Sequence, residues 1–439
     1  MTDTSPIHFP NKRLRSSSQG ACTSSTSPRS GGSTCSITTL SSWFEEGCST
    51  CTSDSSEHDA ASTSPGCHRL LLLDLRPAAE QQRRRLAGIH RQDSSQPPLV
   101  IASLPLEEVK ARSFELPPRY VRFSILVESD DNQTHVRTAE QFLLQPDRVA
   151  SNNRRKFRPW EVDNILVADQ LFWREAREMK LIEDGRESES DFGCEQKSSS
   201  VQVPSLPSPR LWDADGMVEK VLLPLLRKEI EATRTTNRSR KRWRIYDMAS
   251  GAGRDAAFLA EELLSASAER GGARFHVTAI DHRYNAKQTN IVQDFFQRRG
   301  VRGVASVVKA NLSRWETMRE ILLSGRKARG AGGDDGDGDG DGIDTVDILY
   351  LVRFFVRSAI RDLASCSSLR KGSVFAISHF CAAEDGGVWP FDHPHAATVL
   401  GRNEMKDLFI ANDWDVLHDE IVSDGDHGRT LLNFVARKG

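Results

Sequence analysis

The chain has 439 residues, long enough for two or three domains, and its 59 basic and 61 acidic residues give a formal net charge of -2. This balance argues against one dominant surface for binding polyanions such as nucleic acids. No apolar run reaches the roughly 18–20 residues that cross a bilayer, and no apolar block near the N-terminus resembles a secretory signal, so we expect no membrane partner.

Residues 1–66 are rich in small hydroxyl side chains, with 18 Ser and 10 Thr. A segment with so little apolar area does not offset its ordering entropy, so we predict a disordered tail. Residues 4–44 contain no Asp or Glu and carry four basic side chains, a composition typical of organellar transit peptides. A disordered tail has the same composition. We therefore expect a cytoplasmic protein, with a plastid or mitochondrial location as the alternative.

Eight cysteines in a chain of this length are too few for a disulfide scaffold. Cys48 and Cys51 have the C-x-x-C spacing of zinc ligands, and Cys67 and His68 follow. These residues lie in low-complexity sequence that does not fix four ligands in place. We therefore expect free thiols in an intracellular protein and no metal site.

Order is expected from residue 67 onward, where short apolar runs alternate with helical patterns. The predicted strands are 70–76, 99–101 and 121–127, and the predicted helices are 78–86, 138–144 and 165–181. Alternation of this kind indicates an α/β domain with a parallel sheet over residues 67–182. Residues 183–209 are polar and contain three prolines, which is typical of a linker.

Residues 210–439 repeat the same alternation more regularly, after an amphipathic helix at 217–230. The predicted strands are 243–248, 275–280, 305–309, 346–351, 373–378, 414–421 and 430–436. The predicted helices between them are 255–264, 285–298, 315–323, 358–365 and 403–409. Five strand–helix repeats and a final strand pair predict a seven-stranded, doubly wound, Rossmann-like sheet. Residues 332–342, of Gly and Asp alone, are interpreted as a flexible acidic loop.

The most informative segment is 245–255, where a predicted strand enters a turn of small residues and a helix follows. Glycines at Gly251 and Gly253 let backbone N–H groups approach a ligand closely. The start of the helix adds a positive dipole. By itself, a glycine-rich turn of this kind is a weak signal.

Two further features lie at the ends of the next two predicted strands. Asp281 ends the second strand, where a carboxylate can accept hydrogen bonds from both ribose hydroxyls. Asn311 follows the third strand, where its amide can bond an adenine amino group and its neighbours can cover the ring. Because open α/β sheets bind ligands at the carboxyl ends of their strands, we expect all three features to meet.

The motif Asp247-x-Ala249-x-Gly251-x-Gly253 resembles the acidic-Gly signature of class I S-adenosylmethionine-dependent methyltransferases, with Ala249 in place of the first glycine. The continuation Gly253-Arg254-Asp255 is similar to the tellurite-resistance-like and thiopurine-methyltransferase-like branch, and the paired ending also fits. The resemblance implies S-adenosylmethionine as cofactor. It implies that the cofactor site comprises Asp247, Ala249, Ser250, Gly251, Gly253, Arg254, Asp281, His282, Ala310, Asn311, Leu312 and Val352.

The first α/β domain resembles a rhodanese-like domain. The resemblance is carried by Leu71-Leu-Leu-Asp74-Leu-Arg76-Pro77, Leu104-Pro-Leu106 and Glu115-Leu-Pro-Pro118, followed by a strand. In active sulfurtransferases a cysteine begins the loop after that strand, but here the loop is 128–133 and has none. Without a thiolate there is no sulfur nucleophile, so we expect an inactive domain. The domain order resembles a rhodanese–methyltransferase fusion.

Methyl transfer needs mainly alignment and a dry site, because the cofactor is already activated. The candidate acceptor-side residues are Tyr350, Arg353, His379 and His393. A small-molecule acceptor is the first expectation, and an RNA or protein acceptor is the alternative. A binding or scaffold protein with a degenerate methyltransferase fold is a further alternative. A nucleotide dehydrogenase fits less well, since the turn lacks the full G-x-G-x-x-G pattern. The sequence does not specify the acceptor or the oligomeric state.

Overall fold

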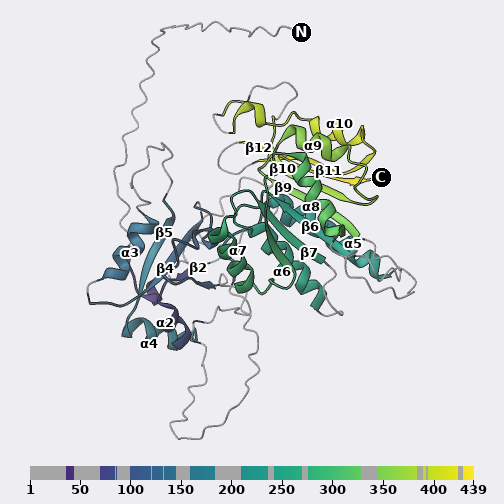
Figure 1. Ribbon diagram of the computed structural model, residues 1–439. Coiled ribbons are helices and arrows are strands. Elements are labelled where there is room, and N and C mark those ends of the chain that lie inside the picture. Colours follow the sequence, from purple (N-terminus) through teal and green to yellow (C-terminus); the bar gives the residue numbers. More distant parts are fainter. Residues whose placement is uncertain are drawn as a thin grey trace, which may run out of the picture. The chain divides into compact units, whose positions relative to one another are not determined.

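The structure is a computed structural model. Two β-sheets and the helices that pack on them account for nearly all regular elements of the described residues (Figure 1). The described residues are 36–43, 70–84, 86, 99–119, 121–131, 133–144, 159–182, 209–235, 242–268, 275–327, 345–382, 389–391, 394–423 and 429–439. Residues 183–208 of the predicted linker, the acidic loop 332–342, Cys48, Cys51 and His393 lie outside them.

The first sheet has five strands in the order β1-β5-β4-β2-β3, and all neighbours are parallel. Its strands are β1 (Ser36–Ile37), β2 (Leu70–Asp74), β3 (Leu99–Ser103), β4 (Arg122–Glu128) and β5 (Glu161–Ala168). Its helices are α2 (Ala78–Arg83), η1 (Ser113–Glu115), α3 (Thr134–Leu143) and α4 (Gln170–Glu178). The predicted parallel α/β sheet is confirmed.

One predicted helix of this region, 165–181, is wrong in its first part. The structure instead ends strand β5 at Ala168 and begins α4 at Gln170. A strand that is buried on both faces has a continuous apolar run, which periodicity alone does not distinguish from a helix. Asp169 marks the boundary, because its carboxylate accepts a hydrogen bond from the Phe172 N–H at 2.8 Å and caps the helix.

The expectation of an unstructured tail through residue 66 is also wrong for residues 36–43. Strand β1 pairs with β5, and the Thr38 N–H donates to the Ile165 carbonyl. Leu40 and Trp43 are 1% and 3% exposed and pack into the core of the first sheet. The Ser- and Thr-rich composition of residues 1–66 gives no sign of Leu40 and Trp43. The apolar area that these two side chains bury favours order in residues 36–43.

Arg76 and Asp74 form a buried ion pair at the end of β2. The Arg76 guanidinium is fully buried and donates to both oxygens of Asp74, at 2.9 and 2.8 Å, and to the Arg84 carbonyl at 2.8 Å. It also lies 4.7 Å from the ring centroid of Trp173. The pair therefore supports the fold, since a buried guanidinium needs this number of partners.

The second sheet has seven strands in the order β11-β12-β10-β9-β6-β7-β8. They are β6 (Arg242–Met248), β7 (Phe275–Asp281), β8 (Ala305–Lys309), β9 (Thr345–Val352), β10 (Val374–Phe380), β11 (Trp414–Ser423) and β12 (Thr430–Lys438). Strand β12 runs antiparallel to both β10 and β11, and the other pairs are parallel. The predicted seven-stranded, doubly wound sheet is confirmed, with its switch point between β6 and β9.

Helices cover both faces of this sheet (Figure 1). Their bounds are η2 (Val218–Leu222), α5 (Leu223–Thr235), α6 (Arg254–Ala268), α7 (Ala286–Arg298), α8 (Trp315–Lys327), α9 (Arg357–Ala364), η3 (Ala396–Thr398) and α10 (Glu404–Ile410). One hydrophobic cluster joins the sheet to α5, α6 and α7 and includes Leu259 and Phe295. The other joins it to α8, α9 and α10 and includes Met318 and Phe409.

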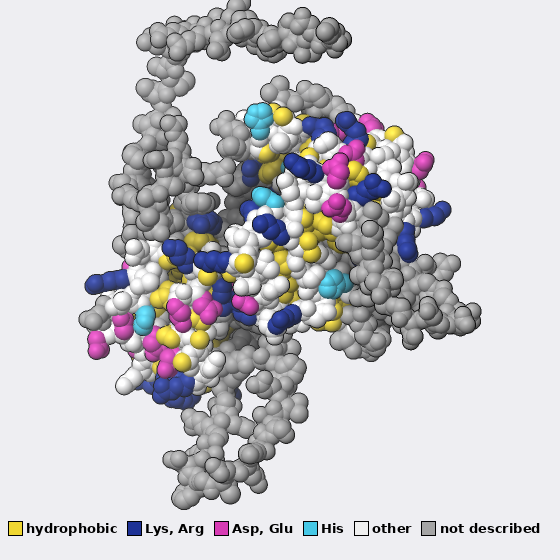
Figure 2. Space-filling model, in the orientation of Figure 1, with side chains coloured by type: hydrophobic (Ala, Val, Ile, Leu, Met, Phe, Trp, Pro, Cys, Tyr) yellow, Lys and Arg dark blue, Asp and Glu magenta, His cyan; other side chains and the backbone are white. Residues whose placement is uncertain are grey.

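Basic and acidic side chains both occur on each folded part of the surface that Figure 2 shows, as the near-equal totals in the sequence suggest. Among the residues described, no helix has the length and apolarity needed to cross a membrane.

Candidate cofactor-binding site

The turn after β6 is built from alternating left-handed residues. Ala249, Gly251 and Gly253 have φ angles of 68°, 61° and 74°. The Ser250 N–H donates to the Ile280 carbonyl of β7 at 3.0 Å, which ties the turn to the neighbouring strand. Ala249 thus adopts the conformation of the glycine that it replaces, at a cost of about 1–2 kcal/mol. The departure from the resembled motif leaves the backbone path intact.

Gly253 permits close packing of the turn against α7. A Cβ atom there would lie 2.9 Å from Val292 Cγ1 and 3.3 Å from two ring atoms of Phe296. No side chain larger than hydrogen fits without movement. Helix α6 begins at the next residue, Arg254, so its N-terminus is held beside the end of β7. The turn lies where the sequence pattern predicts it, and its role in holding a ligand stays a prediction.

Asp281 ends β7 and is 2% exposed. Its Oδ2 accepts the Gly251 N–H at 3.0 Å, which joins the glycine turn directly to the predicted ribose carboxylate. Burial raises the pKa of Asp281, but hydrogen bonds from Arg283 and Gly251 lower it more, so its pKa lies below the ordinary value. Asp281 is therefore ionised at neutral pH and can accept hydrogen bonds from hydroxyl groups.

Asp247 lies behind the turn and is 2% exposed. Its Oδ2 is buried and has no hydrogen-bond partner among the described residues. Burial raises the pKa of Asp247 well above the ordinary value, and the nearby Asp255 carboxyl raises it further. Hydrogen bonds with the Tyr350 hydroxyl and the Ala256 N–H lower the pKa in part, so the carboxyl is partly paired within the chain.

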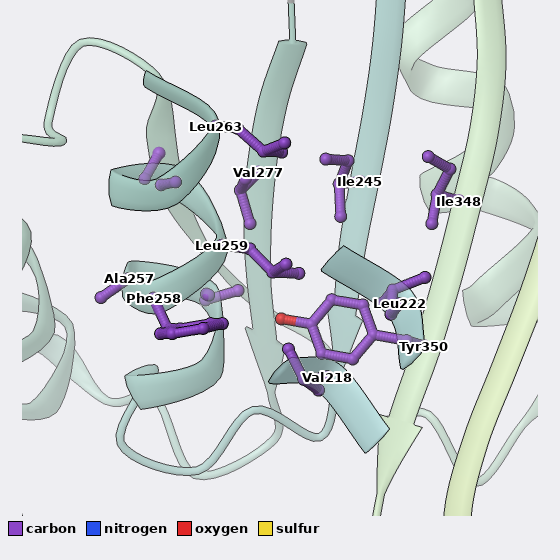
Figure 3. Close-up of a cluster of buried hydrophobic side chains, with 14 of the residues drawn as sticks. Val218, Leu222, Ile245, Ala257, Phe258, Leu259, Leu263, Val277, Ile348 and Tyr350 are labelled. Carbon is purple, nitrogen blue, oxygen red and sulfur yellow. The ribbon is translucent and has the colours of Figure 1, made fainter. Parts of the chain in front are cut away.

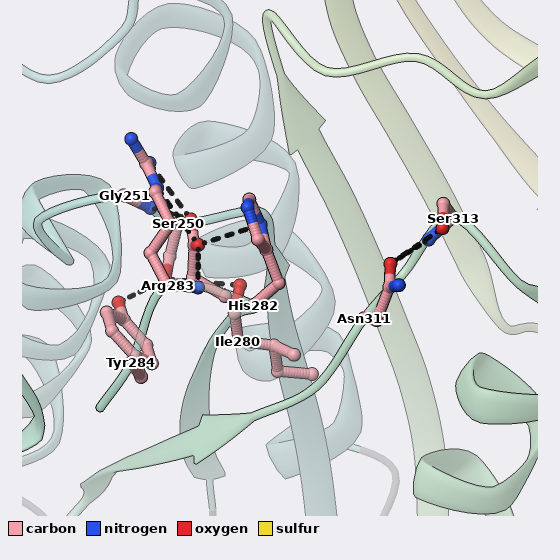
Figure 4. Close-up of polar contacts among 9 residues, drawn as sticks. Ser250, Gly251, Ile280, His282, Arg283, Tyr284, Asn311 and Ser313 are labelled. Carbon is pink, nitrogen blue, oxygen red and sulfur yellow. Dashed lines mark hydrogen bonds and ion pairs between the residues drawn. The ribbon is translucent and has the colours of Figure 1, made fainter. Parts of the chain in front are cut away.

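The third predicted element also lies at this edge of the sheet. The Ala310 N–H donates to the Asp281 carbonyl at 3.3 Å, and Leu312 is 3% exposed against the second core. The side chain of Asn311 is exposed, and its Oδ1 accepts hydrogen bonds from the Ser313 N–H and hydroxyl at 3.1 and 2.7 Å (Figure 4). A bond from this oxygen to an adenine amino group therefore competes with Ser313.

The acceptor-side candidates separate in the structure. Tyr350 is fully buried within the core between the sheet and α6, with Leu259 and Val218 beside it (Figure 3). Burial raises the pKa of the Tyr350 hydroxyl well above its usual value. Tyr350 thus faces the helix layer and belongs with Asp247 instead of with an acceptor at the sheet edge. The reason is strand alternation, which turns every second residue of β9 to this face.

Arg353 and His379 lie at the carboxyl edge, because strand register places them beside the glycine turn. Met248 of β6 pairs with Leu351, and Leu351 pairs with Ile377 of β10. Two residues after Met248, Leu351 and Ile377 come Ser250, Arg353 and His379, which lie at or just beyond the carboxyl ends of these three neighbouring strands. Arg353 is exposed, has φ 54° and donates its N–H to the Ser378 carbonyl at 2.7 Å.

His379 is a buried, neutral imidazole. It is 3% exposed, and burial lowers its pKa to about 4. Its Nε2–H donates to the Thr398 carbonyl at 2.9 Å, so Nδ1 is the unprotonated nitrogen. Phe355 and Phe380 pack against the ring with centroids 5.4 and 5.6 Å away. Nδ1 has no hydrogen-bond partner among the described atoms. Because Nδ1 carries no proton, it can only accept a hydrogen bond.

Sequence reasoning missed two residues just after Asp281. Arg283 binds the carboxylate of Asp281, and Tyr284 pairs its hydroxyl with the Ser250 hydroxyl at 2.6 Å (Figure 4). His282, which was predicted, is mostly exposed and lies 3.3 Å from Asp281. The position of Arg283 two residues after an acidic strand end was the available signal. No cluster of three metal-ligating side chains occurs in the described ranges.

No family model and no curated protein matches the chain. Solved structures are similar to about half of it. A putative sarcosine dimethylglycine methyltransferase from Galdieria sulphuraria is 12% identical, with 49% of this chain and 86% of that chain covered and a TM-score of 0.30. A SAM-dependent methyltransferase from Geobacter sulfurreducens, in complex with S-adenosyl-L-homocysteine, is 14% identical. The match covers 49% of this chain and 90% of that chain, with a TM-score of 0.29.

A third similar structure is the 1,6-didemethyltoxoflavin-N1-methyltransferase of Burkholderia thailandensis, with bound 1,6-didemethyltoxoflavin and S-adenosylhomocysteine. It is 17% identical, covers 51% of this chain and 81% of its own, and has a TM-score of 0.27. Identities and TM-scores of this size leave the function of this chain to be inferred from its own residues.

Proposed function

We propose that this protein is an S-adenosylmethionine-dependent methyltransferase. The observation that carries the proposal is the hydrogen bond from the Gly251 N–H to Asp281, which joins the left-handed glycine turn after β6 to an ionised carboxylate at the carboxyl end of the neighbouring strand β7. Backbone donors beside a helix start, and a carboxylate on the next strand, suit a ligand with an amino-acid end and a ribose.

The residues present fit such a cofactor at three places. Asp281 would accept hydrogen bonds from the ribose hydroxyls. The backbone from Ala310 to Leu312 would lie along the purine. The buried Asp247 carboxyl, whose raised pKa favours the protonated form, would stand behind the turn and offer a hydrogen bond toward the cofactor's amino-acid end.

The cofactor supplies an activated methyl group, so the protein needs only to orient an acceptor and exclude water. His379 would accept a proton or a hydrogen bond through Nδ1 from an acceptor at the same edge. Arg353, exposed in the neighbouring position, would favour an acceptor with negative charge. These features favour a small-molecule acceptor, and an RNA or protein acceptor is the competing hypothesis.

Calorimetric titration of the full chain with S-adenosylmethionine and S-adenosylhomocysteine tests this proposal. We expect saturable binding that the Asp281→Ala variant loses. The matched control is Asp294→Ala, which removes an acidic side chain from α7 away from the strand ends. Absence of binding to the folded wild-type chain would reject the enzyme and favour a scaffold protein.

We further propose that the first sheet is a rhodanese-like domain without sulfurtransferase activity. Loop 128–133 follows β4, where the resemblance places the reactive cysteine, and instead presents Glu128 and Asp130. Asp130 Oδ2 accepts the N–H of Thr134, the first residue of α3, at 2.8 Å, which is a structural task. An assay with thiosulfate and cyanide should give no thiocyanate above the uncatalysed rate, and measurable turnover would refute the assignment.

A further inference from the structure

The carboxylate of Asp281 is fully engaged within the chain. Oδ1 accepts the Arg283 backbone N–H at 2.8 Å and its Nε–H at 3.1 Å. Oδ2 accepts the Gly251 N–H at 3.0 Å and the Arg283 Nη2–H at 3.1 Å. A carboxylate offers about four lone-pair directions, so these four bonds use them all.

The Arg283 guanidinium also covers the glycine turn. A Cβ atom built on Gly251 would lie 3.4 Å from Arg283 Nη2, so a side chain at this position would touch the guanidinium. Figure 4 shows Arg283 beside Gly251 and Ser250, on the loop that follows β7. The side chain is 60% exposed, whereas Asp281 is 2% exposed. Arg283 can therefore move into solvent with little loss of packing, while Asp281 stays in place.

We propose that Arg283 competes with the cofactor's ribose for Asp281 and thereby sets the affinity of the site. This inference rests on the proposed function, because it assigns the diol of that cofactor to Asp281. Two adjacent hydroxyls need the same two oxygens that the side-chain Nε and Nη2 of Arg283 occupy. Binding therefore requires the side-chain pair to open, while the backbone bonds from Arg283 and Gly251 remain.

Competition of this kind makes the apparent affinity proportional to the fraction of molecules in which the Asp281 carboxylate is free of the Arg283 side chain. An ion pair with one exposed partner is modest in strength, which corresponds to a factor of about two to five in that fraction. Arginine remains charged at every accessible pH, so the effect persists wherever Asp281 is ionised. A guanidinium that instead stacked on the bound purine would have the opposite effect on affinity.

The test is calorimetric titration of the full chain at neutral pH with S-adenosylhomocysteine and with adenosine. We expect Arg283→Ala to bind both ligands about two- to fivefold more tightly than the wild type. The matched control is Arg302→Ala, which removes an exposed arginine from the α7–β8 loop at the opposite edge of the sheet and should leave both affinities unchanged.

The possible results separate this inference from the proposed function. Wild-type binding that Arg283→Ala leaves equal or weakens would overturn the competition but not the methyltransferase. No binding by either protein would overturn both. As a second readout, added salt screens the ion pair, so the difference between wild type and variant should narrow. A difference that is constant with salt would also overturn the competition.

Discussion

Substituting Gly253 with alanine tests whether close packing at the glycine turn is a structural requirement. Gly300, at the end of α7, is the matched control, because its φ of 70° is close to the 74° of Gly253. Nothing lies within 4 Å of a Cβ atom at Gly300, whereas one at Gly253 meets Val292 at 2.9 Å and Phe296 at 3.3 Å. The two substitutions therefore share backbone strain and differ in steric overlap.

The left-handed conformation costs alanine about 1–2 kcal/mol at either position. Overpacking adds about 1–3 kcal/mol at Gly253 alone. The smaller entropy of alanine in the unfolded chain offsets part of each cost, but it cancels in the comparison. We therefore expect Gly253→Ala to be less stable than Gly300→Ala by about 1–3 kcal/mol.

Hydrogen exchange of peptides from β6 and β7 measures this difference in the second sheet without interference from the first. Both strands should exchange faster in Gly253→Ala than in Gly300→Ala under the same conditions. Equal protection in the two variants would refute the reasoning, because it would mean that Val292 and Phe296 move aside without cost.

Three further predictions concern buried ionisable groups. Burial raises the pKa of Asp255 to about 6, so the protonated carboxyl contributes stability at low pH that is lost as the pH rises through about 6. Asp255→Asn should therefore raise the urea midpoint of unfolding at about pH 8 and have little effect near about pH 4. Burial lowers the pKa of His379 to about 4, so neutral His379 stabilises the fold above pH 6.5 and that contribution is lost as the pH falls toward 4. His379→Gln should flatten this acid limb in urea titrations, and an imidazole NMR signal that titrates near 6.5 would contradict the assignment. Arg76→Met should destabilise the first sheet by about 3–5 kcal/mol in β2 hydrogen exchange, because Asp74 stays buried without its partner, and adding Asp74→Asn should recover part of the loss.

Much of the second sheet was predictable because its signals are local. Each strand and helix carries its own periodicity, and the glycine turn and Asp281 follow directly from strand ends. Strand β5 was missed because an apolar run of that length fits a buried strand as well as a helix. Strand β1 was missed because two residues carry no periodicity at all.

The site was less predictable than the fold, because side-chain direction depends on tertiary structure. Tyr350 and Arg353 are three residues apart in sequence, yet one enters the core and the other reaches solvent. The pairing of Arg283 with Asp281 depends on how the loop after β7 turns back over the carboxylate. No sequence pattern specifies that turn.

The most direct test of the cofactor site is a crystal structure of the full chain with S-adenosylhomocysteine. We expect the ribose hydroxyls on Asp281, the amino-acid end against the backbone of residues 249–253 and the purine beside residues 310–312. We also expect that the Arg283 side chain has left the Asp281 carboxylate. A ligand bound away from the ends of β6 and β7, or a ribose that does not contact Asp281, would contradict this expectation.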